Sequence, residues 1–242
     1  MRRFWIAGAL CLALSGVPAH ARDKAASAPG VSVLGVSTPS WAGFYFGPTL
    51  GWTFASAQGD YAGFVPPPAA PPMIYYPFDL NPGGGSLGGQ LGYNVQFGAW
   101  VFGLEGDWSW VFNASDRGFD PGGSGRYDDV TLIWTGHARG RIGYLFSQYL
   151  FFFSGGAAFA GTQAAHYAPS NAGGSSWYDT RLLTGYSLGG GIETFLMGNW
   201  IFRVEYLHDH FGSEHYDWVA GSRYSNSDLT LDTVRISFVF RQ

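Results

Sequence analysis

Apolar and polar residues alternate along most of the chain. In the segment 86–97, S-L-G-G-Q-L-G-Y-N-V-Q-F, the odd positions hold residues such as Leu87 and Tyr93, while the even positions hold small or polar residues. The segment 99–112 repeats this pattern, beginning with Trp100. A period of two places successive side chains on opposite faces of a β-strand. Both segments are therefore predicted to be strands with one apolar face.

The same alternation predicts eight strands. We expect them at 41–55, 86–97, 99–112, 130–146, 149–164, 182–196, 199–211 and 229–241. Each is at least as long as the roughly 9–11 residues that a tilted strand needs to cross a membrane. The outward face of the fourth strand is expected to carry both Leu132 and Trp134.

The connections between these strands alternate in length. Gly98-Ala99, Ser147-Gln148 and Met197-Gly198-Asn199 are predicted to be tight turns, the last a three-residue hairpin in which Leu196 faces Trp200. The remaining connections are long and rich in Gly, Pro, Ser and Asp, at 56–85, 113–129, 165–181 and 212–228. Short turns at one end and long loops at the other are typical of outer-membrane barrels. The predicted fold is all-β: an eight-stranded antiparallel up-and-down transmembrane β-barrel with short periplasmic turns and long extracellular loops.

The N-terminal residues are expected to lie outside the barrel. Residues 1–21 combine a short basic head, an apolar run over 4–14 and a small-residue motif that ends at Ala21, which indicates a cleaved signal peptide. An uncleaved anchor is the alternative, although the run is shorter than the ~20 residues of a spanning helix. Residues 22–40 are predicted to be a flexible periplasmic leader, and 41–242 the barrel.

Composition excludes several classes of protein. Only 12% of the residues are charged, the net charge is −4 and Lys24 is the one lysine, so a basic nucleic-acid surface is excluded. Aromatic residues make up 18% of the chain, far too many for a disordered protein. A soluble β-sandwich would need a charged exterior, which the chain lacks. A helical membrane protein is also disfavoured, because the uncharged stretch 142–178 lacks an uninterrupted apolar 18-mer.

Six motifs carry a family resemblance: W-A-G-F-Y-F-G (41–47), G-G-Q-L-G-Y-N (88–94), F-G-L-E-G-D (102–107), G-R-I-G-Y (140–144), N-W-I-F-R-V-E-Y-L (199–207) and T-V-R-I-S-F-V-F-R (233–241). In this order they resemble the immunogenic outer-membrane proteins, or "porin family" group, of alphaproteobacteria, which are related to the OmpA-type barrel. The resemblance implies a monomer in the outer membrane of a Gram-negative bacterium, inserted by the barrel-assembly machinery. It implies a structural role, supporting the membrane and displaying surface loops, without catalysis or a cofactor. The implied partners are outer-membrane lipids, lipopolysaccharide and a host or cell-surface ligand of the loops.

Charged residues concentrate on the inward positions of the predicted strands. Four acids and four bases fall there: Glu105, Asp107, Glu193 and Glu205, with Arg139, Arg141, Arg203 and Arg235. Eight strands enclose a space about wide enough for side chains alone, and buried charges must be paired. We expect Glu193 to pair with Arg203, Glu205 with Arg235, and the remaining acids with the remaining bases. The hypothesis is a salt-bridged core that closes the lumen; the alternative is a narrow small-solute or ion channel lined by the same groups.

Histidines supply the candidate chemistry. The densest group of metal or haem ligand types is His208-Asp209-His210 with Glu214 and His215, in which His208, His210 and His215 are the candidate ligands. The simpler interpretation places them at the headgroup level with polar contacts, so no metal or cofactor is expected. His210 and Ser213 also suggest a lipid A-modifying enzyme, a further alternative, but their spacing does not match the motif of that class. His137 is interpreted as a hydrogen-bonded core residue.

Overall fold

The computed structural model describes most of the chain beyond residue 39. The described ranges are 32–33, 36–37, 40–64, 73–119, 127–167, 176–217 and 224–242, and side chains are described for 40–57, 81–116, 129, 131–163, 180–212 and 229–242. The predicted signal peptide and most of the predicted leader lie outside these ranges. Within the described residues, no helix is long and apolar enough to cross a membrane.

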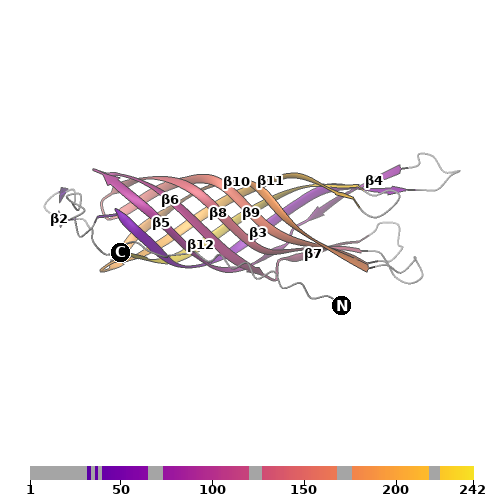
Figure 1. The fold of residues 1–242 in the computed structure, drawn as a ribbon, viewed down its shortest axis with the longest axis horizontal. Coiled ribbons are helices and arrows are strands. Elements are labelled where there is room, and N and C mark those ends of the chain that lie inside the picture. The colour runs from indigo at the N-terminus through magenta and orange to yellow at the C-terminus, as the bar shows by residue number, and fades with distance from the viewer. Residues whose placement is uncertain are drawn as a thin grey trace, which may run out of the picture.

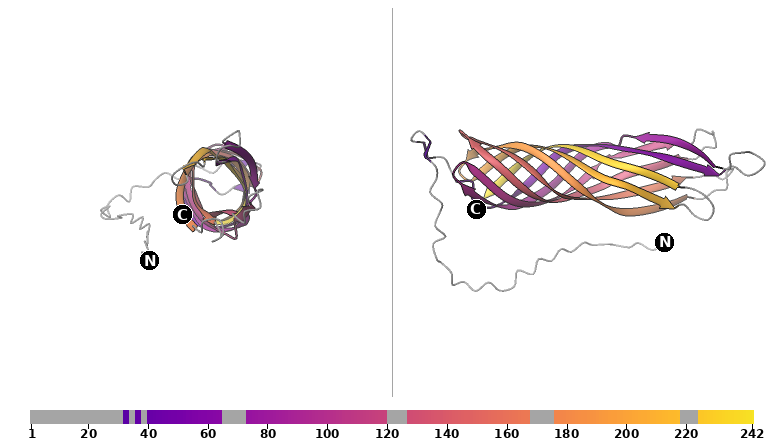
Figure 2. Two further views of the ribbon diagram at one scale, coloured as in Figure 1. Left: turned by 90° about the vertical axis from the view of Figure 1, so that its right-hand side faces the viewer. Right: turned by 90° about the horizontal axis from the view of Figure 1, so that it is seen from above.

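Eight long strands form a closed antiparallel barrel (Figure 1 and Figure 2). They are β3 (Gly43–Phe64), β5 (Gly83–Phe97), β6 (Trp100–Phe112), β8 (Tyr127–Phe146), β9 (Tyr149–Tyr167), β10 (Ser176–Met197), β11 (Trp200–Asp217) and β12 (Tyr224–Arg241). Each strand pairs with its neighbour in the chain, and β12 pairs with β3 to close the sheet. The eight predicted strands and the predicted fold class are confirmed. A separate two-stranded pair, β1 (Ser32–Val33) and β2 (Val36–Ser37), precedes the barrel.

Parts of the predicted long loops are in fact strand. β4 (Met73–Leu80) pairs with the outer half of β3, and β7 (Ser115–Phe119) pairs with the start of β8 (Figure 1). Several barrel strands also continue beyond their predicted ends; β3, for example, reaches Phe64. The sheet therefore extends past the apolar belt, and the extracellular loops are shorter than the sequence analysis predicted.

The register of the strands sets the tilt of the barrel. Following paired residues once around it leads from Phe46 to Ser56, ten residues further along the same strand. The path runs through Leu91, Gly106, Ala138, Ala157, Tyr186, His210 and Thr230. A stagger of this size in an eight-stranded barrel goes with strands tilted by roughly 35–45° and an interior that side chains fill.

The outward face of the barrel is apolar and aromatic. Large apolar side chains such as Leu104 (72%) and Phe153 (73%) are highly exposed there. Near the short turns, Trp100 contacts Tyr144 with ring centroids 5.0 Å apart. Exposed apolar side chains around the whole circumference, with aromatic pairs near the turns, are the arrangement expected of a barrel in a lipid bilayer.

Two local predictions are wrong. A bulge between Leu132 and Trp134 breaks the alternation, so Leu132 points inward and is buried. The turn after β10 contains two residues rather than three: Met197 pairs with Trp200, and an irregularity between Phe195 and Met197 absorbs the extra residue. A bulge reverses the facing of a strand without breaking its pairing. Gly198, with φ of 56°, supplies the left-handed conformation expected at this turn.

Candidate functional site

The barrel interior begins with an apolar layer next to the short turns. Its buried members are Trp41, Tyr45, Val101, Leu145, Leu150, Ile201 and Val239. The backbone N–H of Trp41 donates to Oε1 of Gln96 at 2.7 Å, and the Trp41 ring contacts Phe195 with centroids 4.6 Å apart. The residues just before β3 therefore pack into the periplasmic end of the barrel, where Trp41 is only 1% exposed.

Two arginines and two glutamates form the first part of the charged layer. Nη2 of Arg203 is 2.5 Å from Oε1 of Glu193, and Nη1 of Arg203 is 2.9 Å from Oε2 of Glu105. Arg141 also contacts Glu193 at 2.8 Å. The side chains come from β6, β8, β10 and β11, and each is about 1% exposed. Glu105 thus joins to Glu193 through Arg203, across the lumen.

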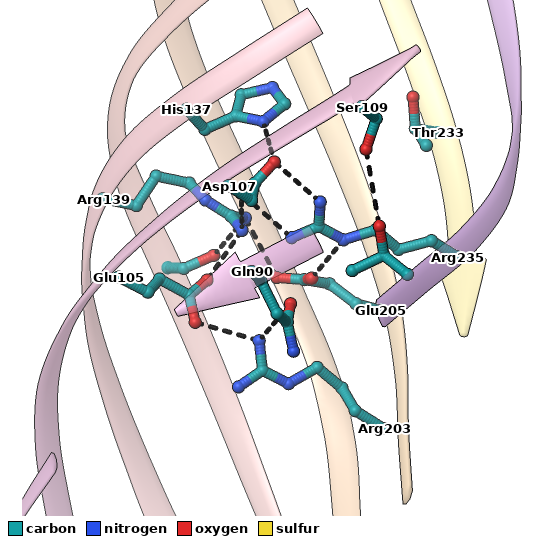
Figure 3. Close-up of polar contacts among 12 residues, drawn as sticks. Gln90, Glu105, Asp107, Ser109, His137, Arg139, Arg203, Glu205, Thr233 and Arg235 are labelled. Atoms are coloured by element: carbon teal, nitrogen blue, oxygen red, sulfur yellow. Dashed lines mark hydrogen bonds and ion pairs between the residues drawn. The ribbon is translucent and has the colours of Figure 1, made fainter. Parts of the chain in front are cut away.

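The second part of the charged layer lies further from the turns, beginning at Asp107, two residues beyond Glu105 on β6. Asp107 binds two guanidinium groups (Figure 3): Nη2 of Arg139 at 3.0 Å and Nη1 of Arg235 at 2.9 Å. Glu205 binds the same two arginines, with Arg139 at 2.9 Å and Nε of Arg235 at 2.7 Å. Arg139 also reaches Glu105 at 2.6 Å, which links both parts into one network. All eight charged residues that the sequence analysis placed in the interior therefore belong to one connected network of ion pairs.

Neutral and aromatic side chains complete the network. The Tyr45 hydroxyl donates to Glu105 at 2.8 Å and accepts from Arg141 at 3.3 Å, while Oε1 of Gln90 accepts from Arg203 at 3.1 Å. The ring of Phe152 lies under the guanidinium groups of Arg141 and Arg203, at 4.2 and 5.1 Å. Stacking on aromatic faces suits guanidinium groups when they are desolvated. The sequence analysis did not identify these three residues as part of the network.

His137 extends the network toward the extracellular side. Its Nδ1 is 2.7 Å from Oδ1 of Asp107 (Figure 3), and its Nε2 is 3.1 Å from Oδ2 of Asp209. The core interpretation of His137 agrees with this placement, but Asp209 was not identified as an interior residue of the network. Its inward position could have been predicted, because it lies an even number of positions beyond Arg203 and Glu205 and so shares their face of β11.

A second apolar layer covers the charged one on the extracellular side. Its members are Ala55, Ala57, Val111, Ala114, Leu132, Ala158, Ala160, Leu183, Phe211, Leu229 and Leu231. The order along β11 illustrates the arrangement: Ile201 belongs to the first apolar layer, Arg203 and Glu205 to the charged layer, and Phe211 to the second apolar layer. The ion pairs are thus enclosed between two apolar layers inside a closed wall of strands.

The candidate ligand histidines do not converge. His208 and His210 both point outward from β11; His208 contacts Asp232, with Nδ1 2.8 Å from Oδ1, and the His210 ring packs on Tyr186 with centroids 5.2 Å apart. The side chain of His215 lies outside the described residues. In the described part of the chain, no group of three or more His, Cys, Asp or Glu side chains is placed to hold a metal ion.

Comparisons with curated proteins give relatives over most of the chain. The 31 kDa outer-membrane immunogenic protein of Brucella melitensis biotype 1 is 25% identical over 232 residues, which cover 95% of both chains. The 25 kDa outer-membrane immunogenic protein of Brucella abortus biovar 1 is 26% identical over 84% of this chain and 79% of its own. The 22 kDa outer membrane protein of Rhizobium leguminosarum bv. viciae is 29% identical over 56% of this chain and 58% of its own.

Among solved structures, Neisserial surface protein A matches with a TM-score of 0.42 and 10% identity, over 83% of this chain and 98% of that one. The model of the outer membrane protein β-barrel domain matches residues 7–241. The relatives are named as outer-membrane proteins, and the chain folds as a closed eight-stranded barrel with an apolar exterior. The chain therefore belongs to the outer membrane protein β-barrel domain family and is a protein of the bacterial outer membrane.

Proposed function

We propose that the protein is a closed structural barrel, which anchors its extracellular loops in the outer membrane and reinforces that membrane without conducting solutes. The observation that carries this proposal is the network that joins Glu193, Arg203, Glu105 and Arg139 across the lumen. Charges buried at this depth are held by their partners, because separating one member from the rest leaves an uncompensated charge.

The enclosure of the ion pairs supports a closed state. An aqueous pore needs a continuous polar path, but the charged layer lies between two apolar layers. Trp41 and Ile201 lie on its periplasmic side, and Leu231 and Phe211 on its extracellular side. A solute would have to cross both apolar layers as well as the ion pairs. This arrangement favours a scaffold over the narrow channel that the sequence left open.

The outward face carries part of the side-chain arrangement of a hydrolase, but not all of it. On the outward face of the described strands, the pair of Asp232 and His208 has the orientation of the corresponding pair in a hydrolase, with Nδ1 bound to the carboxylate. Among the described residues, no hydroxyl group is hydrogen-bonded to Nε2 of His208, so the nucleophile of such a site is missing. The relatives are likewise named as outer-membrane immunogenic proteins rather than enzymes.

Single-channel recording tests the closed lumen. Residues 22–242 would be refolded, checked for heat-dependent gel mobility and inserted into a planar bilayer, beside a sample with Arg139→Gln. The wild-type protein is expected to remain silent. Steady conductance steps in the wild type, with an ion preference that Arg139→Gln alters, would contradict the closed barrel and indicate a channel.

The reinforcing role is tested in cells. Deleting the gene is expected to increase sensitivity to detergent, and expression of the wild-type chain should restore resistance. A matched strain expressing the Arg139→Gln protein at the same folded level tests whether the interior charge itself matters for resistance. Unchanged detergent sensitivity after deletion would contradict the role.

A further inference from the structure

Three polar side chains meet on the outward face of β11 and β12. Oδ1 of Asp232 accepts hydrogen bonds from the Tyr206 hydroxyl, at 2.5 Å, and from Nδ1 of His208, at 2.8 Å. His208 and Asp232 are directly paired across the two strands. Their side chains are 42% and 44% exposed, so this outward cluster (Tyr206, His208 and Asp232) faces the surroundings of the barrel and not its interior.

The outward cluster lies near the extracellular edge of the apolar band, at a depth where other strands still carry apolar side chains on their outward faces. His208 is eight residues beyond Trp200 at the periplasmic turn, which corresponds to about 20 Å along the barrel axis for a tilted strand. The apolar band of an outer-membrane barrel is ~25 Å tall. On β10 the outward face is still apolar at Leu182, fifteen residues from Met197, and on β6 at Phe112, twelve residues from Trp100.

The carboxylate of Asp232 needs further hydrogen-bond donors at this depth, beyond Tyr206 and His208. Charged side chains on the lipid face destabilise a barrel in a depth-dependent way, and a carboxylate can accept several hydrogen bonds. Both bonds to Asp232 use Oδ1; among the described residues, no side chain is bonded to its Oδ2 or to Nε2 of His208. Oδ2 of Asp232 and Nε2 of His208 are therefore both available to a molecule that contacts this face of the barrel.

The surroundings of the outward cluster favour a sugar over a phosphate. Asp232 is paired with the exposed Phe54 on β3, and the exposed Tyr186 packs on His210, two residues beyond His208 on β11. Aromatic faces beside a carboxylate suit a ring with several hydroxyl groups, which donate and accept hydrogen bonds. No lysine or arginine of the described residues forms an ion pair with the cluster, so a phosphate would meet a carboxylate instead of a cation.

We propose that Tyr206, His208 and Asp232 bind the sugar headgroup of an outer-leaflet glycolipid. Sugar hydroxyls donate to Oδ2 of Asp232 and interact with Nε2 of His208, while the apolar side chains below them contact the acyl chains. Bound in this way, the headgroup removes the penalty of an exposed carboxylate at this depth. The inference rests on the outer-membrane placement within the proposed function but not on the closed lumen.

Glycolipid retention tests this inference. The refolded chain would be placed in phosphatidylcholine nanodiscs with a limiting amount of purified lipopolysaccharide, and the lipopolysaccharide retained per barrel would be measured after washing. Loss of one hydrogen bond to a charged group corresponds to about tenfold weaker binding. Asp232→Asn and His208→Gln are therefore each expected to lower retention about tenfold. Asp116→Asn makes the same chemical change on β7, away from the cluster, and should leave retention unchanged.

Three results would overturn the inference. The first is equal retention by Asp232→Asn and the wild type, when both pass the gel-mobility test of folding. The second is equally effective competition by phosphatidic acid, which would indicate phosphate recognition. The third is release of the lipopolysaccharide by EDTA, which would indicate a bridging divalent cation. Conductance of the same samples is recorded separately, so an open lumen with normal retention would refute only the proposed closed barrel.

Discussion

Nε2 of His137 lies 3.1 Å from Oδ2 of Asp209, a residue 72 positions later in the chain. The other ring nitrogen is 2.7 Å from Asp107, so carboxylates flank the imidazole on both sides. Both nitrogens can donate only when the ring carries two protons. In that form His137 is the fifth cation beside the four arginines of the network, and it balances five buried carboxylates.

Replacing His137 should weaken the barrel markedly. His137→Gln breaks the charge pairing with Asp107 and Asp209, and loss of one partner from a buried pair typically costs about 3–5 kcal/mol. Urea unfolding in lipid vesicles, followed by gel mobility, measures the change in the free energy of unfolding. His210→Gln is the matched control on the outward face, because His210 packs on Tyr186 and is in no ion pair among the described residues, so its loss should cost under ~1 kcal/mol. Equal stability of the two variants would contradict a balanced interior.

Arg203 and Glu193 should be energetically coupled. Arg203→Met leaves Glu193 with one arginine instead of two and should cost about 3–5 kcal/mol. Adding Glu193→Gln removes the uncompensated charge, so the double variant should be less destabilised than the sum of the single variants. The same urea titration yields the coupling free energy of this double-mutant cycle. Strict additivity would mean that the two charges do not stabilise each other.

Gly92 should be intolerant of even a small side chain. A Cβ at this position would lie 2.4 Å from the hydroxyl oxygen of Tyr45, which is bound to Glu105. Gly92→Ala is therefore expected to displace Tyr45 and to cost about 1–3 kcal/mol, as overpacking does in other cores. Gly89→Ala serves as the control in the same strand, since its Cβ would meet its nearest neighbour at 3.8 Å. Similar unfolding midpoints for both variants would show that Tyr45 can move without loss.

Gly198 should matter for the turn after β10. Its φ of 56° is left-handed, and a β-branched residue there costs roughly 1–2 kcal/mol. Gly198→Val should lower the free energy of unfolding by that amount, whereas Gly212→Val, in a strand with open space around it, should have little effect. The comparison uses unfolding in vesicles under identical conditions. A larger effect at Gly212 would contradict the importance of turn conformation.

The candidate histidines illustrate what alternation can predict. Its period placed His208 and His210 on one face of a strand, and the structure has both pointing outward. The partner of His208 was not predictable in the same way. Asp232 lies on another strand, and the contact depends on the register between β11 and β12. The strands β4 and β7 were not predicted either, because residues typical of loops surround them in the sequence.

The sequence alone determined the eight strands, the closed all-β class and the inward facing of Glu105, Arg139 and their partners, because facing follows from a local period of two. Only the tertiary structure decided the contacts across the lumen, such as His137 with Asp209 and Arg203 with Glu105. Those contacts depend on the ten-residue stagger of the closed barrel, which brings distant strands to a common height. The inward position of Leu132 was likewise a tertiary outcome, since the bulge changes which face a side chain occupies and the apolar residues of the sequence do not mark where it falls.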